Sequence, residues 1–111
     1  PEEQARLPAV PVERALVQRH PGSRRKTLFL AAHASHIVDW PIPEGRLLLL
    51  QLMEFATQRE FVYQHKWRVG DFVIWDNRCT MHRGRPSPAD QPRDMRRTTV
   101  LEPMATLQRV A

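Results

Sequence analysis

The sequence predicts a mostly β fold with one helix, in the α+β class, within a single small domain. Short apolar runs recur between turns that contain proline or glycine, which is typical of strands. One segment only has the 3.6-residue period of a helix, and the chain contains no internal repeat. With 111 residues, of which 41% are hydrophobic, the chain can bury the core of one domain.

The first expected elements follow from local patterns. Prolines interrupt the N-terminal segment, within which Val10–Val17 includes a short strand, and a turn begins at His20. Lys26–Ala32 is predicted to be a buried strand, because it is polar at its start and apolar beyond. Pro41 and Pro43 then end a loop and lead into the helix.

Glu44–Gln58 is the predicted helix, since proline and glutamate suit its first turn and apolar residues form a stripe along it. That stripe, expected to face a core, comprises Leu48, Leu49, Leu52, Phe55 and Ala56. Three further strands are expected, and they are Glu60–Lys66, Phe72–Trp75 and Arg96–Leu101. The tail, residues 103–111, has no clear pattern.

Composition and charge indicate which partners and which cellular compartment to expect. The net charge is +5, but the basic residues are scattered rather than clustered, so nucleic acid is not the expected partner. The single cysteine, Cys79, cannot form an internal disulfide, which favours a reducing compartment. No apolar run is long enough to span a bilayer, and the N-terminus lacks a signal-peptide pattern. We expect a cytoplasmic protein that does not contact a membrane.

The candidate chemistry lies between Trp75 and Val100. His82 follows a predicted strand in a loop, where functional side chains are often displayed. A neutral imidazole is a ligand for iron and other transition metals. A lone histidine is more often a surface or hydrogen-bonded residue, so the residues alone leave both interpretations open.

Two arginines follow His82 along the chain. If their segment is a strand, its period of two places Arg93 and Arg97 on one face, about 13 Å apart. A guanidinium matches a carboxylate in bidentate geometry, which indicates a bound organic acid. An outward-facing basic strand is the equally weighted alternative. Asp76 is explained by an Asx turn without catalysis, and Cys79 has no general base at a useful spacing.

Through Trp75-Asp76-Asn77-Arg78, Thr80, His82 and residues 93–99, the sequence strongly resembles the TauD/TfdA family of Fe(II)- and 2-oxoglutarate-dependent dioxygenases. The likeness extends from about residue 10 to residue 100 and is closer to the 2,4-dichlorophenoxyacetate branch than to the taurine branch. It implies a double-stranded β-helix, a jelly-roll or cupin-like fold. In that fold two histidines and one carboxylate hold the iron.

The resemblance also implies roles for single residues. His82 matches the distal histidine ligand of the metal, and Arg93 matches the arginine that binds the distal carboxylate of 2-oxoglutarate. Arg97 lies where relatives approach the acidic end of the substrate. The implied cofactors are Fe(II) and 2-oxoglutarate as co-substrate, together with O2. The expected reaction hydroxylates a small organic acid, such as a phenoxyacid or a sulfonate, and converts 2-oxoglutarate to succinate.

The chain departs from the family in one respect, because it contains no His-x-Asp or His-x-Glu pair. Residues 1–111 are therefore predicted to be the C-terminal portion of such a domain, without its N-terminal half and inactive by themselves. A truncated binding or interaction module is the alternative, with nucleic-acid binding disfavoured. Open strand edges and an uncovered apolar face predict a homo-oligomer, strand exchange, or further residues upstream of Pro1 that cover them.

Overall fold

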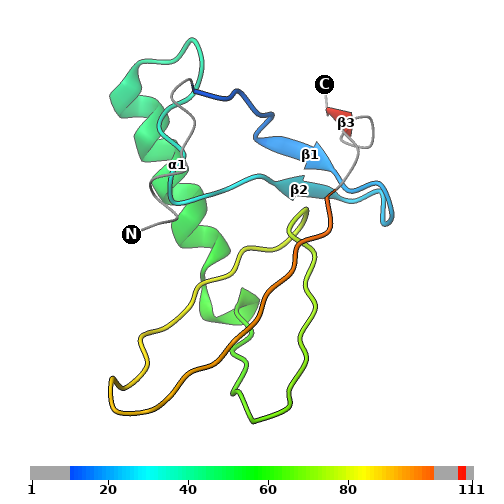
Figure 1. Ribbon diagram of the computed structural model, residues 1–111. Coiled ribbons are helices and arrows are strands. Elements are labelled where there is room, and N and C mark those ends of the chain that lie inside the picture. Colours follow the sequence, from blue (N-terminus) through cyan, green and yellow to red (C-terminus); the bar gives the residue numbers. More distant parts are fainter. Residues whose placement is uncertain (1–10, 102–107, 110–111) are drawn as a thin grey trace.

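Figure 1 shows the computed structural model, which describes residues 11–101 and 108–109. The elements in chain order are β1 (Val17–Arg19), β2 (Lys26–Leu28), α1 (Ile42–Ala56), the 3-10 helix η2 (Arg59–Phe61) and β3 (Gln108–Arg109). The helix lies beside a small sheet, and residues 62–101 form two long loops that extend away from both (Figure 1). Regular structure is therefore confined to the two ends of the described chain and to its middle helix.

The sheet has three short strands in the order β2-β1-β3. β1 and β2 form an antiparallel hairpin in which Gln18 lies opposite Thr27, and β3 pairs antiparallel with the other edge of β1. The predicted strand Lys26–Ala32 is confirmed for its first three residues. The strand expected within Val10–Val17 begins only at Val17. β3 lies in the tail, where the sequence shows no pattern.

The hairpin turn begins at His20, as the sequence predicts. The backbone N–H of His20 donates to the carbonyl of Arg25 at 2.9 Å, and that of Arg24 donates back to the carbonyl of His20 at 2.9 Å. Arg24 adopts a positive φ of 63°, in the left-handed region that closes tight turns. The turn therefore holds the His20 side chain at a fixed place beside the sheet.

The predicted helix is confirmed, with both ends two residues earlier than expected, at Ile42 and Ala56. Pro43 suits the first turn, where its missing N–H has no partner to lose. At the other end the hydroxyl of Thr57 donates to the carbonyl of Met53 at 2.8 Å, which satisfies an acceptor of the last turn. Within the described residues, no helix is long and apolar enough to cross a membrane.

The apolar stripe of α1 is half-buried rather than buried. Four of its five predicted members are partly covered, but Phe55 is exposed and its ring lies 5.5 Å from that of Phe61. The buried residue of the helix is Gly45. A Cβ at Gly45 would lie 3.2 Å from the backbone nitrogen of Ile37, so the absence of a side chain allows this close approach.

The prediction of strands at Glu60–Lys66, Phe72–Trp75 and Arg96–Leu101 is wrong for this structure. Phe72 and Ile74, apolar residues of the predicted strand Phe72–Trp75, are 86% and 80% exposed. Alternation of apolar and polar residues is a local property, whereas a strand needs a neighbouring chain about 5 Å away to complete its backbone hydrogen bonds. Within the described residues no such neighbour pairs with these three segments.

The buried apolar side chain of the described region is Leu30, just after β2. We expect Leu30→Ala to lower the free energy of unfolding by about 2–3 kcal/mol, because it removes buried methyl groups and leaves a cavity. Leu47→Ala is the matched control, since Leu47 lies in α1 and is 55% exposed, and it should cost less than about 1 kcal/mol. Urea unfolding followed by circular dichroism measures both, and equal losses would contradict the role of Leu30.

Candidate functional site

The candidate site is built on the turn that follows the apolar run ending at Trp75. The carbonyl of Asp76 accepts the hydroxyl of Thr80 at 2.6 Å and the N–H groups of Thr80 and Cys79 at 3.1 and 3.3 Å. The indole N–H of Trp75 donates to the side-chain oxygen of Asn77 at 2.8 Å. These bonds give residues 75–80 a fixed shape, although they lie outside regular secondary structure.

The Asp76 carboxylate is the most densely bonded group of this turn. It accepts the backbone N–H of Arg78 at 2.9 Å, as in the predicted Asx turn, and the Arg78 guanidinium through Nε at 2.9 Å and Nη2 at 2.8 Å. It also accepts Nε2 of His20 at 2.9 Å. The side-chain bonds from Arg78 and then from His20 hold the pKa of Asp76 well below its usual range. Asp76 is therefore an anion that organises its surroundings.

The hydrogen bonds of His20 indicate which tautomer its ring adopts. Its Nδ1 accepts the backbone N–H groups of Gly22 and Ser23, each at 3.1 Å, so Nδ1 carries no proton. A neutral ring then has its proton on Nε2, which faces Asp76. The side chain is only 12% exposed. Sequence reasoning placed His20 in a turn and missed this contact, which spans 56 residues of the chain.

His20, Asp76 and Cys79 also bring one possible ligand atom each within 4.8 Å of one another. This group is better described as a hydrogen-bonded cluster than as a metal centre. Both nitrogens of His20 already have partners, and the carboxylate of Asp76 is engaged by Arg78. The thiol of Cys79 donates to the backbone carbonyl of Asp76 at 3.7 Å. A cation here would have to displace several of these bonds.

His82, the predicted metal ligand, lies in the loop just after this turn. Its imidazole is exposed and has no hydrogen-bond partner among residues 11–101. The ring packs against the indole of Trp75, with the centroids 4.9 Å apart and the planes tilted by 47°. One face of the imidazole is thus in contact with the indole of Trp75, while its nitrogens have no hydrogen-bond partner among the described residues. That arrangement fits a side chain that donates a lone pair to a metal.

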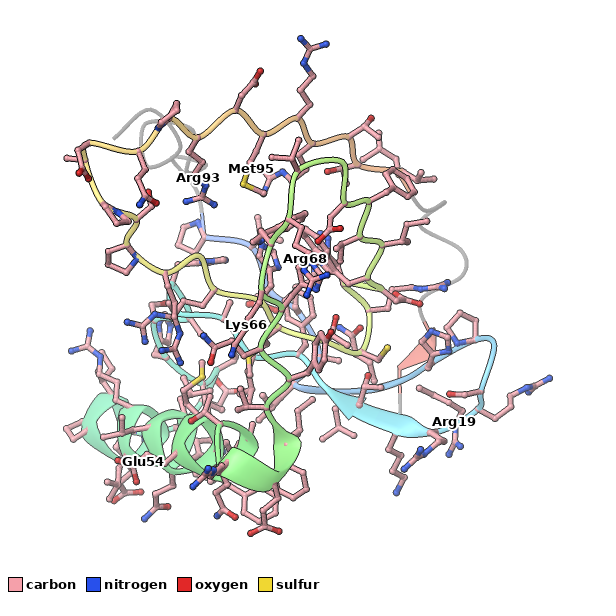
Figure 2. All side chains as sticks on the ribbon, turned by 90° about the horizontal axis from the view of Figure 1, so that it is seen from below. Arg19, Glu54, Lys66, Arg68, Arg93 and Met95 are labelled. Atoms are coloured by element: carbon pink, nitrogen blue, oxygen red, sulfur yellow. The ribbon has the colours of Figure 1, made fainter. Side chains whose placement is uncertain are left out.

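Arg93, the predicted anchor for an anion, lies on the second long loop. Its Nε contacts the sulfur of Met95 at 2.9 Å, and Figure 2 shows both side chains pointing to the same side of their segment, toward the interior of the loops. The other guanidinium nitrogens have no hydrogen-bond partner in the described part of the chain. Arg97 is exposed on the same segment. In the part of the structure that is described, no hydrogen bond or ring contact joins His82 to Arg93.

Comparison with known protein families shows to which family the chain belongs. The model of the "Taurine catabolism dioxygenase TauD, TfdA family" matches residues 3–99. The chain belongs to the TauD/TfdA family. The matched range contains His82, Arg93 and Arg97, together with the other residues of 75–99 on which the resemblance was based.

Two TauD/TfdA relatives are named for phenoxyacid substrates. One is the alpha-ketoglutarate-dependent 2,4-dichlorophenoxyacetate dioxygenase of Cupriavidus pinatubonensis, 56% identical over 83% of this chain and 32% of the relative. The other is the (S)-phenoxypropionate/alpha-ketoglutarate-dioxygenase of Sphingobium herbicidovorans, 43% identical over 74% of this chain and 29% of the relative. The chain thus spans about a third of the length of the curated relatives it matches.

Solved TauD/TfdA-like structures also match. The crystal structure of AAD-2 in complex with Mn(II) and N-oxalylglycine superimposes with a TM-score of 0.76 at 55% identity, over 86% of this chain and 37% of that one. A 2,4-D dioxygenase structure from Burkholderia xenovorans, itself described as putative in function, superimposes with a TM-score of 0.56 at 61% identity, over 58% and 25% of the two chains. The backbone therefore follows part of the fold of these proteins.

The low pKa of Asp76 predicts a pH dependence of stability. Because the folded pKa lies below the unfolded value of about 3.9, the contribution of this carboxylate is complete above the unfolded pKa and is lost as the pH falls through the folded pKa. We expect the urea midpoint to fall more between about pH 6 and about pH 3 in the unsubstituted protein than in Asp76→Asn. Asp90→Asn is the control at an exposed carboxylate and should keep the original slope. Identical slopes in all three proteins would contradict the prediction.

Proposed function

We propose that this chain supplies one iron ligand and the co-substrate anchor of an Fe(II)- and 2-oxoglutarate-dependent dioxygenase that oxidises an organic acid. The observation that carries the proposal is the exposed imidazole of His82, whose nitrogens have no hydrogen-bond partner among the described residues. By resemblance His82 matches the family's distal histidine ligand, and the chain is 56% identical, over 83% of its length, to a relative named as an alpha-ketoglutarate-dependent dioxygenase.

Fe(II) with 2-oxoglutarate would supply the activation of O2: the co-substrate would lose CO2 and take one oxygen atom to become succinate, and the other oxygen atom would hydroxylate the substrate. The residues of this chain bind and orient the reactants. Arg93 would pair its free guanidinium nitrogens with the distal carboxylate of 2-oxoglutarate, which fixes the orientation of the co-substrate. The Trp75 ring, packed on His82, would hold the imidazole at one angle and cover that face from water.

His82 provides one of the three protein ligands of a facial triad. The other two would come from a His-x-Asp or His-x-Glu pair, and residues 1–111 contain none. We therefore propose that these residues form the C-terminal portion of the domain and require the remaining portion for turnover. A double-stranded β-helix would then pair the segments 60–66, 72–75 and 96–101 with strands that these residues do not include.

The substrate is proposed to be a phenoxyacid or a related small organic anion, on the strength of the names of the relatives. Arg97 lies four residues after Arg93 and is exposed, so its guanidinium would receive the acid group of the substrate. The exposed apolar side chains of the loops, including Phe72 and Ile74, would be covered either by the remaining portion of the domain or by a second copy in a homo-oligomer, because such surfaces are normally covered by protein. A role as a binding module without catalysis is the second candidate, favoured by the missing ligand pair.

Arg93→Ala in the full-length protein is expected to raise the dissociation constant of 2-oxoglutarate by roughly 30-fold or more, because it removes a charge-assisted bond to a carboxylate. An anaerobic titration with Fe(II) present measures this constant. Arg96→Ala removes the same charge three residues further along the chain, at a position that the resemblance does not assign to 2-oxoglutarate, and should leave affinity within about twofold. Equal weakening by both substitutions would show a general charge effect instead of an anchor.

His82→Ala is expected to abolish the charge-transfer band that Fe(II) and 2-oxoglutarate give under anaerobic conditions, because a ligand of the metal is lost. Stability should change little, since the exposed imidazole has no hydrogen bond among the described residues. His33→Ala, at another exposed histidine, should keep the band. A full band in His82→Ala would remove this residue from the proposed metal site.

A further inference from the structure

We propose that His20 is a positioning residue for His82 and acts on it through Asp76. This inference rests on the proposed function, in which His82 ligates the metal. His20 and His82 belong to different parts of the chain, the β1–β2 turn and the loop after Trp75. The Asp76 carboxylate, 2.9 Å from Nε2 of His20, connects the two parts.

The hairpin fixes the direction in which His20 points. Its Nδ1 accepts two backbone N–H groups, from Gly22 and Ser23, within its own turn. A flipped ring would lose both of these bonds and would present a carbon atom in their place. The proton on Nε2 is therefore aimed at Asp76 by the backbone of the turn. With only 12% of the side chain exposed, water competes little for this bond.

Asp76 extends this constraint to the residues that precede and follow it in the chain. Its carbonyl holds Thr80 and Cys79, so the turn that leads to His82 is built on the Asp76 backbone. Trp75 precedes Asp76 directly and places its ring 4.9 Å from that of His82. A shift of Asp76 would therefore move both Trp75 and the turn that leads to His82, and so would change the contact between the rings of these two residues.

Arg78 cannot replace His20 in this role through its bonds to Asp76. Those bonds join residues two apart and fix the internal shape of the turn. The bond from His20 spans 56 residues and fixes where the turn lies relative to the hairpin. Orientation of a metal ligand by groups behind it commonly changes metal affinity by 10- to 100-fold.

Two substitutions separate the pair of bonds at Nδ1 from the single bond at Nε2. In His20→Asn the short amide oxygen can accept the N–H groups of Gly22 and Ser23, as in an Asx turn, but the side chain cannot reach Asp76. In His20→Gln the longer amide can donate to Asp76 and gives up the bonds within the turn. If His20 had a purely structural role, metal affinity would fall in proportion to the loss of stability. Urea unfolding measures that loss in both variants.

The experiment uses the full-length protein and two readouts. Mn(II) affinity is measured by electron paramagnetic resonance with 2-oxoglutarate present, and the contact between the rings of Trp75 and His82 is measured by nuclear Overhauser effect on histidine-labelled protein without metal. We expect His20→Asn to weaken Mn(II) binding by about tenfold and to lose the ring contact. His20→Gln should stay within about twofold and keep the contact.

Equal Mn(II) affinity in all three proteins would overturn the proposal, as would weakening in both variants in proportion to their stability. If the unsubstituted protein binds no Mn(II), the proposed function fails and the ring contact alone decides. Loss of the contact in His20→Asn but not in His20→Gln would then support positioning of His82 by His20. A contact retained in both variants would overturn it.

Discussion

The hydrogen bond between His20 and Asp76 joins the ordered sheet to the loops that carry the candidate site. On one side it starts from a hairpin turn whose backbone sets the ring of His20. On the other side it ends on a carboxylate kept ionised by Arg78, from which the turn before His82 is built. Without a continuous sheet beneath them, residues 75–82 depend on such side-chain bonds for their shape.

The sequence predicts those parts of the fold whose causes are local. The helix at Ile42–Ala56 follows from a 3.6-residue apolar period and a proline in its first turn, and both act within one or two turns. The hairpin turn follows from His20-Pro21-Gly22-Ser23 in the same way. The strands predicted at 60–66, 72–75 and 96–101 have the right alternation, but pairing depends on a second chain segment that no pattern within them specifies.

The candidate site also contains residues that local patterns identify and a contact that depends on the three-dimensional fold. His82, Arg93 and Arg97 were identified by spacing and by resemblance, and the family match includes all three. Their roles at a metal and a co-substrate stay predictions. The part played by His20 was missed, because a histidine before Pro-Gly-Ser and an aspartate after an apolar run each look like local caps. Their contact depends on how the hairpin and the later loop meet in space.

The long sequence separation of the His20–Asp76 contact has a consequence for the order in which the chain folds. Closing a loop of 56 residues costs about 2 kcal/mol more chain entropy than closing the turn from His20 to Arg25. The hairpin and the helix form from near neighbours, and contacts between neighbours form fastest. The surroundings of His82 are thus assembled after the elements that frame them, so an incompletely folded chain would have its secondary structure before it had a site.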